Sequence, residues 1–380
     1  MLFQDDGVGF NTPGIIRYPF EQMVKANDKT MLIRINKDYP MPMLDIKNKV
    51  SSFDEDASEI IDDLKEQREM IINTGCRTDV PAFYSKWLMN RIREGFVLVR
   101  NPYYPNQVTK YSLSPNVVDC LAFCTKNPEP MLKYLNELDV YKQYWFVTIT
   151  PYGKDIEPVV PNKEKVIESF KKLSEHVGVD SIGWRYDPIF INDEFNIEKH
   201  IECFSEMAQS LKGYTRNCTI SFLDLYEKVK RNAPDLRTLT QDEQIRIAKA
   251  FAKIGEENNM VIHSCCEETF LAEYGLKCNG CMSQEIIEKS IDCTLEPPKR
   301  KNIRQECNCL MGNDIGAYNT CGHLCRYCYA NANKKLVIEN MKKHNEDSPF
   351  LIGNVEAGDK ITEAKQKSLI VSENEQLSFI

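Results

Sequence analysis

Short apolar runs rich in β-branched and aromatic residues alternate along the chain with longer segments of helical period, and this alternation restricts the fold most strongly. The apolar runs lie at residues 70–75, 95–100, 117–124, 144–150, 181–186, 218–223 and 260–265. Helical candidates lie at residues 81–94, 161–178, 196–213 and 240–259. Strands that alternate with helices form parallel sheets, so the pattern predicts an α/β fold. Seven units, with an eighth expected near the C-terminus, favour a closed TIM-like (β/α) barrel over an open doubly wound sheet. The Gly-rich fingerprint of a dinucleotide-binding sheet is also missing from the first unit.

The chain divides into four predicted segments. Residues 1–68 form an N-terminal extension that closes with an acidic helical run at 54–70. Residues 69–277 form the barrel body, and residues 278–345 form a cysteine-rich, cluster-binding segment. The tail, residues 346–380, is expected to pack on the barrel and to cover the cluster, because reactive intermediates must be kept from water.

Charge and composition restrict the partners. A net charge of −8 supplies no dense cationic face, which disfavours nucleic acid as a partner. Neither an export signal nor a run of eighteen apolar residues is visible, so we expect a cytoplasmic protein without a membrane span. In that compartment, fifteen cysteines indicate reduced thiols and metal ligands rather than disulfides.

Charged residues follow several of the predicted strands, at the end where β/α barrels place their reactive groups. The candidates for substrate positioning are Arg77, Asp79, Lys126, Arg185 and Asp187. Loops are polar in any case, and each cation is equally well explained by a buried ion pair with Asp79 or Asp187. The recurrence of such residues at successive strand ends favours a functional role.

Three cysteines near the C-terminus have the spacing CxxxCxxC: Cys321, Cys325 and Cys328. A short loop can direct three such thiolates at three irons of a 4Fe–4S cube, which leaves the fourth iron open. The alternative is a zinc knot built from four of the cysteines between residues 278 and 328, although zinc sites usually contain CxxC pairs. His323 lies within the loop, and we expect it to hydrogen-bond rather than to bind iron.

Four further cysteines form a second candidate metal site: Cys278, Cys281, Cys307 and Cys309. A CxxC pair followed by CxC is typical of structural zinc, of a second iron–sulfur cluster or of a redox pair, and the three alternatives stay open.

His263, Cys265 and Cys266 end the last predicted strand. Residues two apart on a strand share a face, so His263 and Cys265 are expected to point together and Cys266 to point away. The pair is either an activated thiol or an inert part of the core.

The CxxxCxxC spacing, with an aromatic residue (Tyr327) before the last cysteine, resembles the cluster motif of the radical SAM superfamily. The resemblance implies that S-adenosylmethionine binds the open iron and that an external electron donor such as ferredoxin or flavodoxin reduces the cluster. Arg77, Lys126 and Arg185 would then be tested as partners of the bound carboxylate and ribose. The motif lies near the C-terminus of this chain, whereas in the superfamily it normally follows the first barrel strand.

The chain from about residue 71 onwards also resembles an uncharacterised bacterial and archaeal family of unknown function that has a similar C-terminal cysteine cluster. The matching pieces are CRTDVPAFYSKWLMNRIREGFVLVRNP (76–102), VDCLAFCTKNPEPML (118–132), TPYGKDIEP (150–158), WRYDPI (184–189), DIGAYNTCGHLCRYCYANAN (314–333) and SPFLIG (348–353). The family supplies no reaction.

Three hypotheses follow. The first is a radical enzyme that cleaves S-adenosylmethionine and abstracts hydrogen from a small-molecule substrate. The second is an iron–sulfur lyase or hydratase whose open iron acts as a Lewis acid. The third is a protein without catalytic activity that is held together by zinc or an iron–sulfur cluster.

Overall fold

The computed structural model describes residues 2–6, 21–22, 25–26, 31–35, 50–53, 70–297, 308–310 and 312–371. The chain falls into two compact units, Met1–Arg68 and Glu69–Ile380. The first unit contains a parallel sheet in the order β1 (Leu2–Asp6), β2 (Met31–Ile35) and β3 (Val50–Phe53). The helix predicted at residues 54–70 lies, apart from Met70, outside the described residues.

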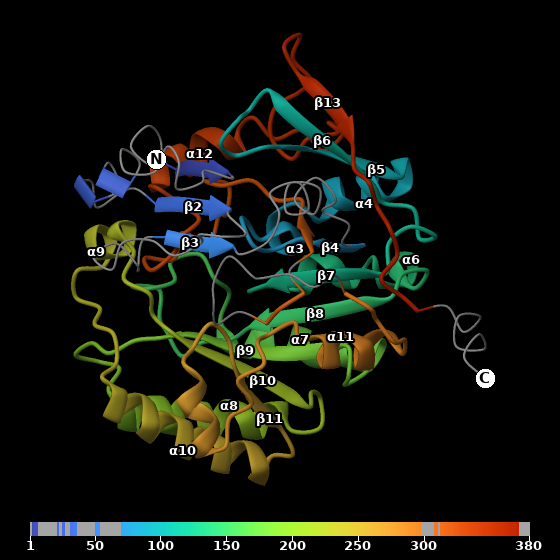
Figure 1. Cartoon of the computed structure of the whole chain (residues 1–380). Coiled ribbons are helices and arrows are strands. Elements are labelled where there is room, and N and C mark those ends of the chain that lie inside the picture. Colours follow the sequence, from blue (N-terminus) through green and yellow to red (C-terminus); the bar gives the residue numbers. More distant parts are fainter. Residues whose placement is uncertain are drawn as a thin grey trace, which may run out of the picture. The chain divides into compact units, whose positions relative to one another are not determined.

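The second unit is built on a seven-stranded sheet in which all neighbouring strands are parallel (Figure 1). Its order is β11 (Val261–Ser264), β10 (Asn217–Phe222), β9 (Ile182–Ile189), β8 (Gln143–Thr148), β7 (Cys120–Thr125), β4 (Ile71–Asn73) and β12 (Asn313–Asp314). Six of the strands coincide with predicted apolar runs, which confirms the α/β pattern. From β4 to β11 the strands lie side by side in chain order, as they would in a barrel.

The prediction of a closed TIM-like barrel is not met in the described part of the chain, where the sheet is open and has β11 and β12 as its edges. The edge beside β4 holds β12, which is only two residues long. The apolar run at 95–100, predicted as a barrel strand, forms β5 (Phe96–Arg100) in another sheet, where it pairs antiparallel with β6 (Gln107–Ser112). Apolar alternation predicts a strand but not its partner, and the short β5–β6 connection permits only an antiparallel neighbour.

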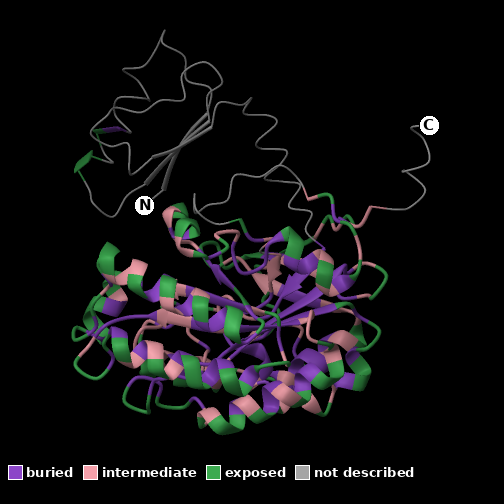
Figure 2. Ribbon diagram, turned by 90° about the horizontal axis from the view of Figure 1, so that it is seen from below, coloured by how far each residue is buried: buried purple, intermediate pink, exposed green. Residues whose placement is uncertain are grey.

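One face of the large sheet packs against helices and holds the main hydrophobic core (Figure 2). Trp87, Trp145 and Trp184 are completely buried in this core, and the stacked rings of Phe204 and Phe251 join two of the helices. The helices are α3 (Val80–Phe83), α4 (Ser85–Glu94), α7 (Lys163–Val177), α8 (Ile197–Leu211) and α10 (Gln241–Glu257), which confirms the predicted helical segments.

The opposite face carries Cys120, Cys124, Tyr144, Phe146 and Arg185, and we call it the cysteine face. Among the described residues it packs against α11 (Gln284–Ile291) and the segments around it, so in that part of the chain one helix covers it rather than a helical layer. Such a thin cover leaves polar groups of the sheet available to the segments that carry the other cysteines.

The remaining elements lie in the connections between strands or at the edges of the sheets. They are α5 (Glu129–Leu132), α6 (Leu135–Leu138), α9 (Glu227–Asn232), the 3₁₀ helix η2 (Thr269–Tyr274), α12 (Lys334–Met341) and β13 (Lys360–Glu363). β13 pairs with β6. Further along the tail, the Leu369 amide and the Ser368 hydroxyl both donate to Asp119 before β7, at 2.7 and 2.6 Å.

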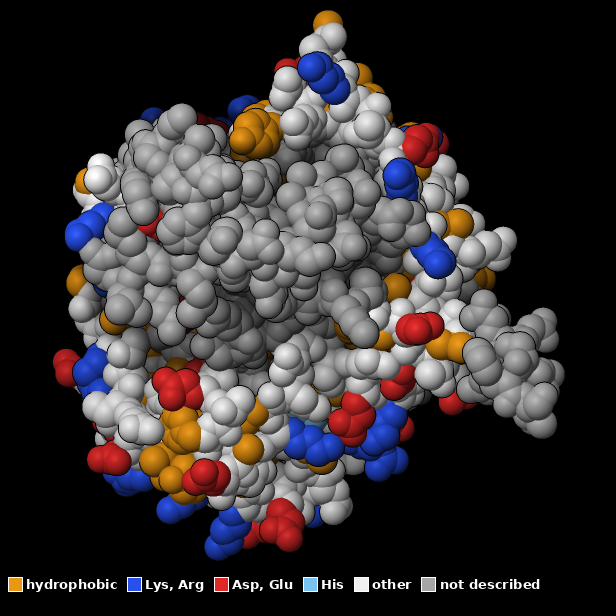
Figure 3. Space-filling view, in the orientation of Figure 1, with side chains coloured by type: hydrophobic (Ala, Val, Ile, Leu, Met, Phe, Trp, Pro, Cys, Tyr) orange, Lys and Arg blue, Asp and Glu red, His pale blue; other side chains and the backbone are white. Residues whose placement is uncertain are grey.

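Lysine and arginine side chains lie beside aspartate and glutamate side chains around α8 and α10, on the surface seen in Figure 3. The ion pair between Arg246 and Glu198 joins these two helices. Within the described ranges, no helix has the length and hydrophobicity that crossing a bilayer requires.

Acidification is expected to destabilise the fold through His200, which is completely buried. Its Nε2 donates to the Phe190 carbonyl at 2.7 Å, and its Nδ1 accepts from the Tyr186 hydroxyl at 2.9 Å. Burial lowers its pKa to about 4. Between pH 4 and pH 6.5 the unfolded chain therefore binds more protons at this site, so stability is complete above pH 6.5 and falls as the pH drops.

We expect the free energy of unfolding to be about 2 kcal/mol lower at pH 5 than at pH 7 because of this group alone. Denaturant titrations at both pH values measure it, with His200→Gln as the comparison. An identical pH dependence in the variant would contradict the assignment.

Candidate functional site

The CxxxCxxC loop docks onto the connections that follow β4 and β8. The Arg326 amide donates to the Ile156 carbonyl at 3.0 Å, and the His323 carbonyl accepts from the Val159 amide at 3.2 Å. On the other side, the Tyr84 hydroxyl donates to the Thr320 carbonyl at 2.7 Å. These contacts place the loop at the carboxyl ends of the strands, the edge at which α/β proteins bind ligands.

The thiols of Cys321, Cys325 and Cys328 are electrostatic neighbours in this loop. Burial is the largest cause that raises the pKa of each, and at Cys321 the charge of Asp79 and then the other two thiols raise it further. Among the described residues, three ligand atoms lie within 4.8 Å of one another only at a different group of cysteines. The loop thiols therefore lack the spacing of a single-ion site, whereas thiolates on three different irons of a cube do not need it.

Asp79 joins the cluster loop to α3 and to Lys126 through both of its carboxylate oxygens. Its Oδ1 caps α3 by accepting from the Ala82 amide at 3.0 Å. Its Oδ2 accepts from the Lys126 amide at 2.7 Å and pairs with His323 Nε2 at 2.8 Å. His323 Nε2 forms the expected kind of contact, although its partner is a carboxylate, while its buried Nδ1 has no hydrogen-bond partner among the described groups. That His323 does not bind iron stays a prediction.

A buried carboxylate, Glu157, lies beside the loop and joins three side chains into what we call the Glu157 network. Its Oε1 accepts from Lys126 Nζ and from the Thr150 hydroxyl, both at 2.7 Å, and also from the Tyr327 hydroxyl. Burial alone would raise its pKa, but Lys126 and the hydroxyl donors hold the pKa below its usual range. Burial lowers the pKa of Lys126, but the charges of Glu157 and then of Cys325 raise it above its usual value. The network thus holds one cation next to the loop thiols.

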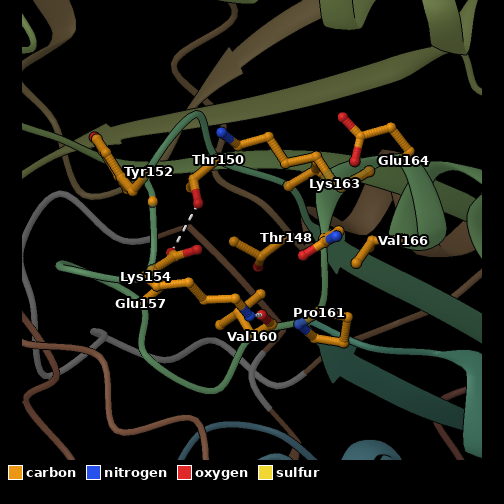
Figure 4. A pocket seen from close by; sticks show the side chains of 13 residues that line it. Thr148, Thr150, Tyr152, Lys154, Glu157, Val160, Pro161, Lys163, Glu164 and Val166 are labelled. Carbon is orange, nitrogen blue, oxygen red and sulfur yellow. Dashed lines mark hydrogen bonds between the residues drawn. The ribbon is translucent and has the colours of Figure 1, made fainter.

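A pocket of about 170 Å³ opens on the other side of this network, between the end of β8 and the start of α7 (Figure 4). Thr150 and Glu157, joined by the dashed line in the figure, belong to its wall. Lys154 and Lys163 also line it, and their ammonium groups donate to the carbonyls of Val160 and Pro151. None of the cysteines lines this pocket.

Each predicted strand-end cation has a carboxylate partner. Arg77 pairs with Asp314 of β12 through Nε at 2.8 Å. Lys126 pairs with Glu157 in the Glu157 network. Neither partner is the Asp79 that the sequence suggested, because both partners come from connections or strands distant in sequence. Both cations thus form ion pairs, and their contact with a bound carboxylate or ribose stays a prediction.

Arg185 and Asp187 lie on the cysteine face near the carboxyl end of β9, where the Arg185 NH2 group contacts Asp187 Oδ2 at 2.9 Å. Arg185 NH1 donates to Cys124 Sγ at 3.6 Å, while its buried Nε has no hydrogen-bond partner among the described groups. Burial raises the pKa of Asp187, although Arg185 opposes the shift. The neighbouring Glu267 accepts from the Phe222 amide at 2.7 Å, and burial raises its pKa to about 8.

A second thiol group lies on the cysteine face and comprises Cys265 after β11, Cys281 and Cys309. All three residues are buried, and their sulfurs lie within 4.8 Å of one another. Cys309 Sγ is 3.4 Å from Cys281 Sγ and 3.7 Å from Cys265 Sγ. We call this group the cysteine triad; its sulfurs could hold a metal ion.

The triad only partly matches the second site that the sequence predicted. Cys281 and Cys309 belong to it, whereas Cys278 turns its sulfur towards the Thr269 carbonyl at 3.9 Å. Cys307 lies outside the described residues. Cys265 joins instead, which sequence spacing did not indicate because it lies on a separate strand end.

The predicted pairing of His263 with Cys265 is not seen. The ring nitrogens of His263 contact Asn279 Oδ1 at 2.7 Å and Asn217 Oδ1 at 3.1 Å. The prediction that Cys266 points away is wrong, because its sulfur lies 3.9 Å from Cys265 Sγ. The reason is the backbone: Cys266 has a φ of 58°, so the extended geometry that alternates side chains has already ended.

A match to a protein-family model shows which family the chain belongs to. The family model described as a domain of unknown function, DUF1848, matches residues 71–330. The chain belongs to this DUF1848 family. No curated protein matches the chain. The DUF1848 match begins at β4 and ends two residues after Cys328, so the loop thiols and the triad all lie within it.

Glu157 is the residue of the DUF1848 domain that sequence reasoning missed. The stretch TPYGKDIEP carries it, but its three charged residues cannot be told apart in the sequence, and only the structure shows that Glu157 is the buried one. The sequence signal was its position in the connection after β8, in the same stretch as Thr150.

Replacing Gly280 with alanine is expected to disrupt the triad of the DUF1848 domain. Gly280 has a φ of 86°, and an added Cβ would lie 2.7 Å from Cys309 Sγ. Gly213 is a matched control, since its φ of 85° is the same but nothing lies within 4 Å of its Cβ position. Both variants should lose about 1–2 kcal/mol of stability for left-handed strain. Only Gly280→Ala should also weaken metal binding, which competition with a chelator measures; equal effects would contradict the close approach.

Proposed function

We propose that the chain is an iron–sulfur enzyme in which Cys321, Cys325 and Cys328 hold a 4Fe–4S cluster with one open iron, and in which that iron binds S-adenosylmethionine for reductive cleavage. One observation carries the proposal. Three neighbouring thiols, without single-ion spacing, lie at the carboxyl ends of parallel strands beside a buried cation.

The surrounding residues fit a negatively charged cluster. The Lys126 ammonium group lies within the Glu157 network and interacts with Cys325, so it can offset the charge of thiolates and sulfides. Asn331 Nδ2 donates to the Cys321 carbonyl at 2.9 Å, and His323 is held by Asp79, so the loop is positioned from both sides. An open-iron cluster, when bound and reduced by an external donor, supplies one electron that cleaves S-adenosylmethionine and starts hydrogen abstraction from a substrate.

Arg185 is the residue best placed to contact a substrate. It lies on the same side of the sheet as Asp187, and its Nε is buried without a partner among the described residues. A carboxylate or phosphate group would satisfy this donor, because guanidinium groups bind such anions in a planar, bidentate manner. Asp79 and Arg77 act differently: their contacts position the loop and β12.

Product analysis tests the proposal. The full chain is reconstituted anaerobically with iron and sulfide, reduced with dithionite and incubated with S-adenosylmethionine. We expect methionine and 5′-deoxyadenosine in equal amounts, and neither from Cys325→Ala. An iron-loaded chain that releases no 5′-deoxyadenosine would refute the radical proposal, and dehydration of a hydroxy acid by that chain would identify a Lewis-acid lyase instead.

A further inference from the structure

The cysteine triad differs from the loop thiols in the spacing of its sulfurs. The separations are 3.4 Å for Cys281–Cys309 and 3.7 Å for Cys265–Cys309, and Cys266, which lies outside the triad, has its sulfur 3.9 Å from that of Cys265. Zinc–sulfur bonds of about 2.3 Å in a tetrahedron place any two sulfurs about 3.8 Å apart. The separations within the triad therefore suit one tetrahedral ion. Cys266 offers a fourth thiol beside Cys265, but it lies outside the group whose sulfurs are all within 4.8 Å of one another, so its side chain must turn to complete the site.

Two backbone features bring these sulfurs together. The left-handed φ of 58° at Cys266 turns the chain after β11, so that sulfurs of adjacent residues lie on the same side. The left-handed φ of 86° at Gly280 lets Cys309 Sγ approach the turn. A left-handed conformation at a cysteine is uncommon and persists where the surroundings demand it.

Hydrogen bonds and charge around the triad suit thiolates rather than thiols. The amides of Cys281 and Met282 point at Cys309 Sγ, at 3.1 and 3.4 Å. Arg185 interacts electrostatically with Cys265 and Cys281 from the same face of the sheet. Amide donors and a nearby cation stabilise negative charge on metal-bound sulfur.

We propose that Cys265, Cys266, Cys281 and Cys309 bind one zinc ion, which ties the end of β11 to the turn before α11 and to the segment that carries Cys309. The site is structural, because four thiolates leave no open position. It is separate from the cluster loop and does not depend on the proposed catalytic function. It also predicts which cysteine of the CNGC sequence is a ligand: Cys281 and not Cys278.

Metal analysis of the full chain tests this site. The zinc content and the zinc affinity, by competition with a chromogenic chelator, are measured for the wild type and for Cys281→Ala, Cys309→Ala and Cys266→Ala. Loss of one ligand should weaken zinc binding by more than about 100-fold, the upper end of what losing an outer-shell partner costs. Cys278→Ala is the matched control and should bind zinc as the wild type does, as should Cys325→Ala in the cluster loop.

Cobalt substitution and alkylation complete the test. Cobalt in the wild type should give the intense sulfur-to-metal bands of four thiolates, and these bands should weaken in Cys266→Ala. In the wild type, zinc should protect the four ligands from alkylation while Cys278 reacts with or without chelator. The proposal would be overturned if the four cysteines were alkylated equally with and without chelator. It would also be overturned if Cys281→Ala kept its zinc affinity or lost an iron–sulfur absorption. Unchanged cobalt bands in Cys266→Ala would overturn its assignment as the fourth ligand.

Discussion

Cys325→Ala is expected to abolish the iron–sulfur cluster while leaving the fold in place. Cys325 is the middle of the three loop cysteines, and its thiol, like that of Cys328, interacts with Lys126, so its loss would leave the proposed cube without one of its three ligands. After anaerobic reconstitution, iron, sulfide and visible absorption should fall to the background of the chain without added iron.

Cys203→Ala is the control for this variant, because Cys203 lies on α8, is partly exposed and is far from the loop in sequence. It should bind iron and sulfide as the wild type does. If Cys325→Ala retains the full cluster, the loop is not the cluster site.

Glu157→Ala is expected to cause the largest loss of stability of any single charged residue in the site. The change leaves the buried Lys126 ammonium without its carboxylate and removes the acceptor of the Thr150 and Tyr327 hydroxyls. Removing one partner of a buried ion pair costs about 3–5 kcal/mol, because the other charge stays buried. Denaturant unfolding measures the change, and iron content should fall because Lys126 is no longer held beside Cys325.

The exposed pair of Lys86 and Glu346 provides the comparison, since its nitrogen–oxygen distance is also 2.7 Å. Glu346→Ala should cost less than about 1 kcal/mol, as exposed ion pairs do. Equal losses in the two variants would show that the Glu157 network does not support the loop.

The sequence predicted the parts of the fold that depend on local periodicity. Runs such as YWFVTIT and SIGWRY form β8 and β9, and the segment at 240–259 forms α10, because apolar alternation and capping residues act within a few positions. Closure of the barrel was not predictable in this way. It depends on which strand pairs with which, and β5 paired with its neighbour β6 instead.

The three cysteines of the candidate site could be recognised in the sequence, whereas the hydrogen-bond and ion-pair partners around them could not. Cys321, Cys325 and Cys328 lie within one loop, so their spacing can be read directly from the sequence. The partner of Arg77 is 237 residues away at Asp314, and nothing local indicates that contact. A shorter separation, 44 residues, likewise concealed the contact of Cys265 with Cys309.

The open iron is tested most directly by electron paramagnetic resonance of the reduced, reconstituted chain before and after addition of S-adenosylmethionine. We expect a reduced cluster signal that requires Cys321, Cys325 and Cys328 and that changes shape when S-adenosylmethionine binds the fourth iron. A signal that stays identical with S-adenosylmethionine in excess, or one that also disappears when a fourth cysteine is replaced, would mean that the protein fills all four corners and would contradict the proposed chemistry.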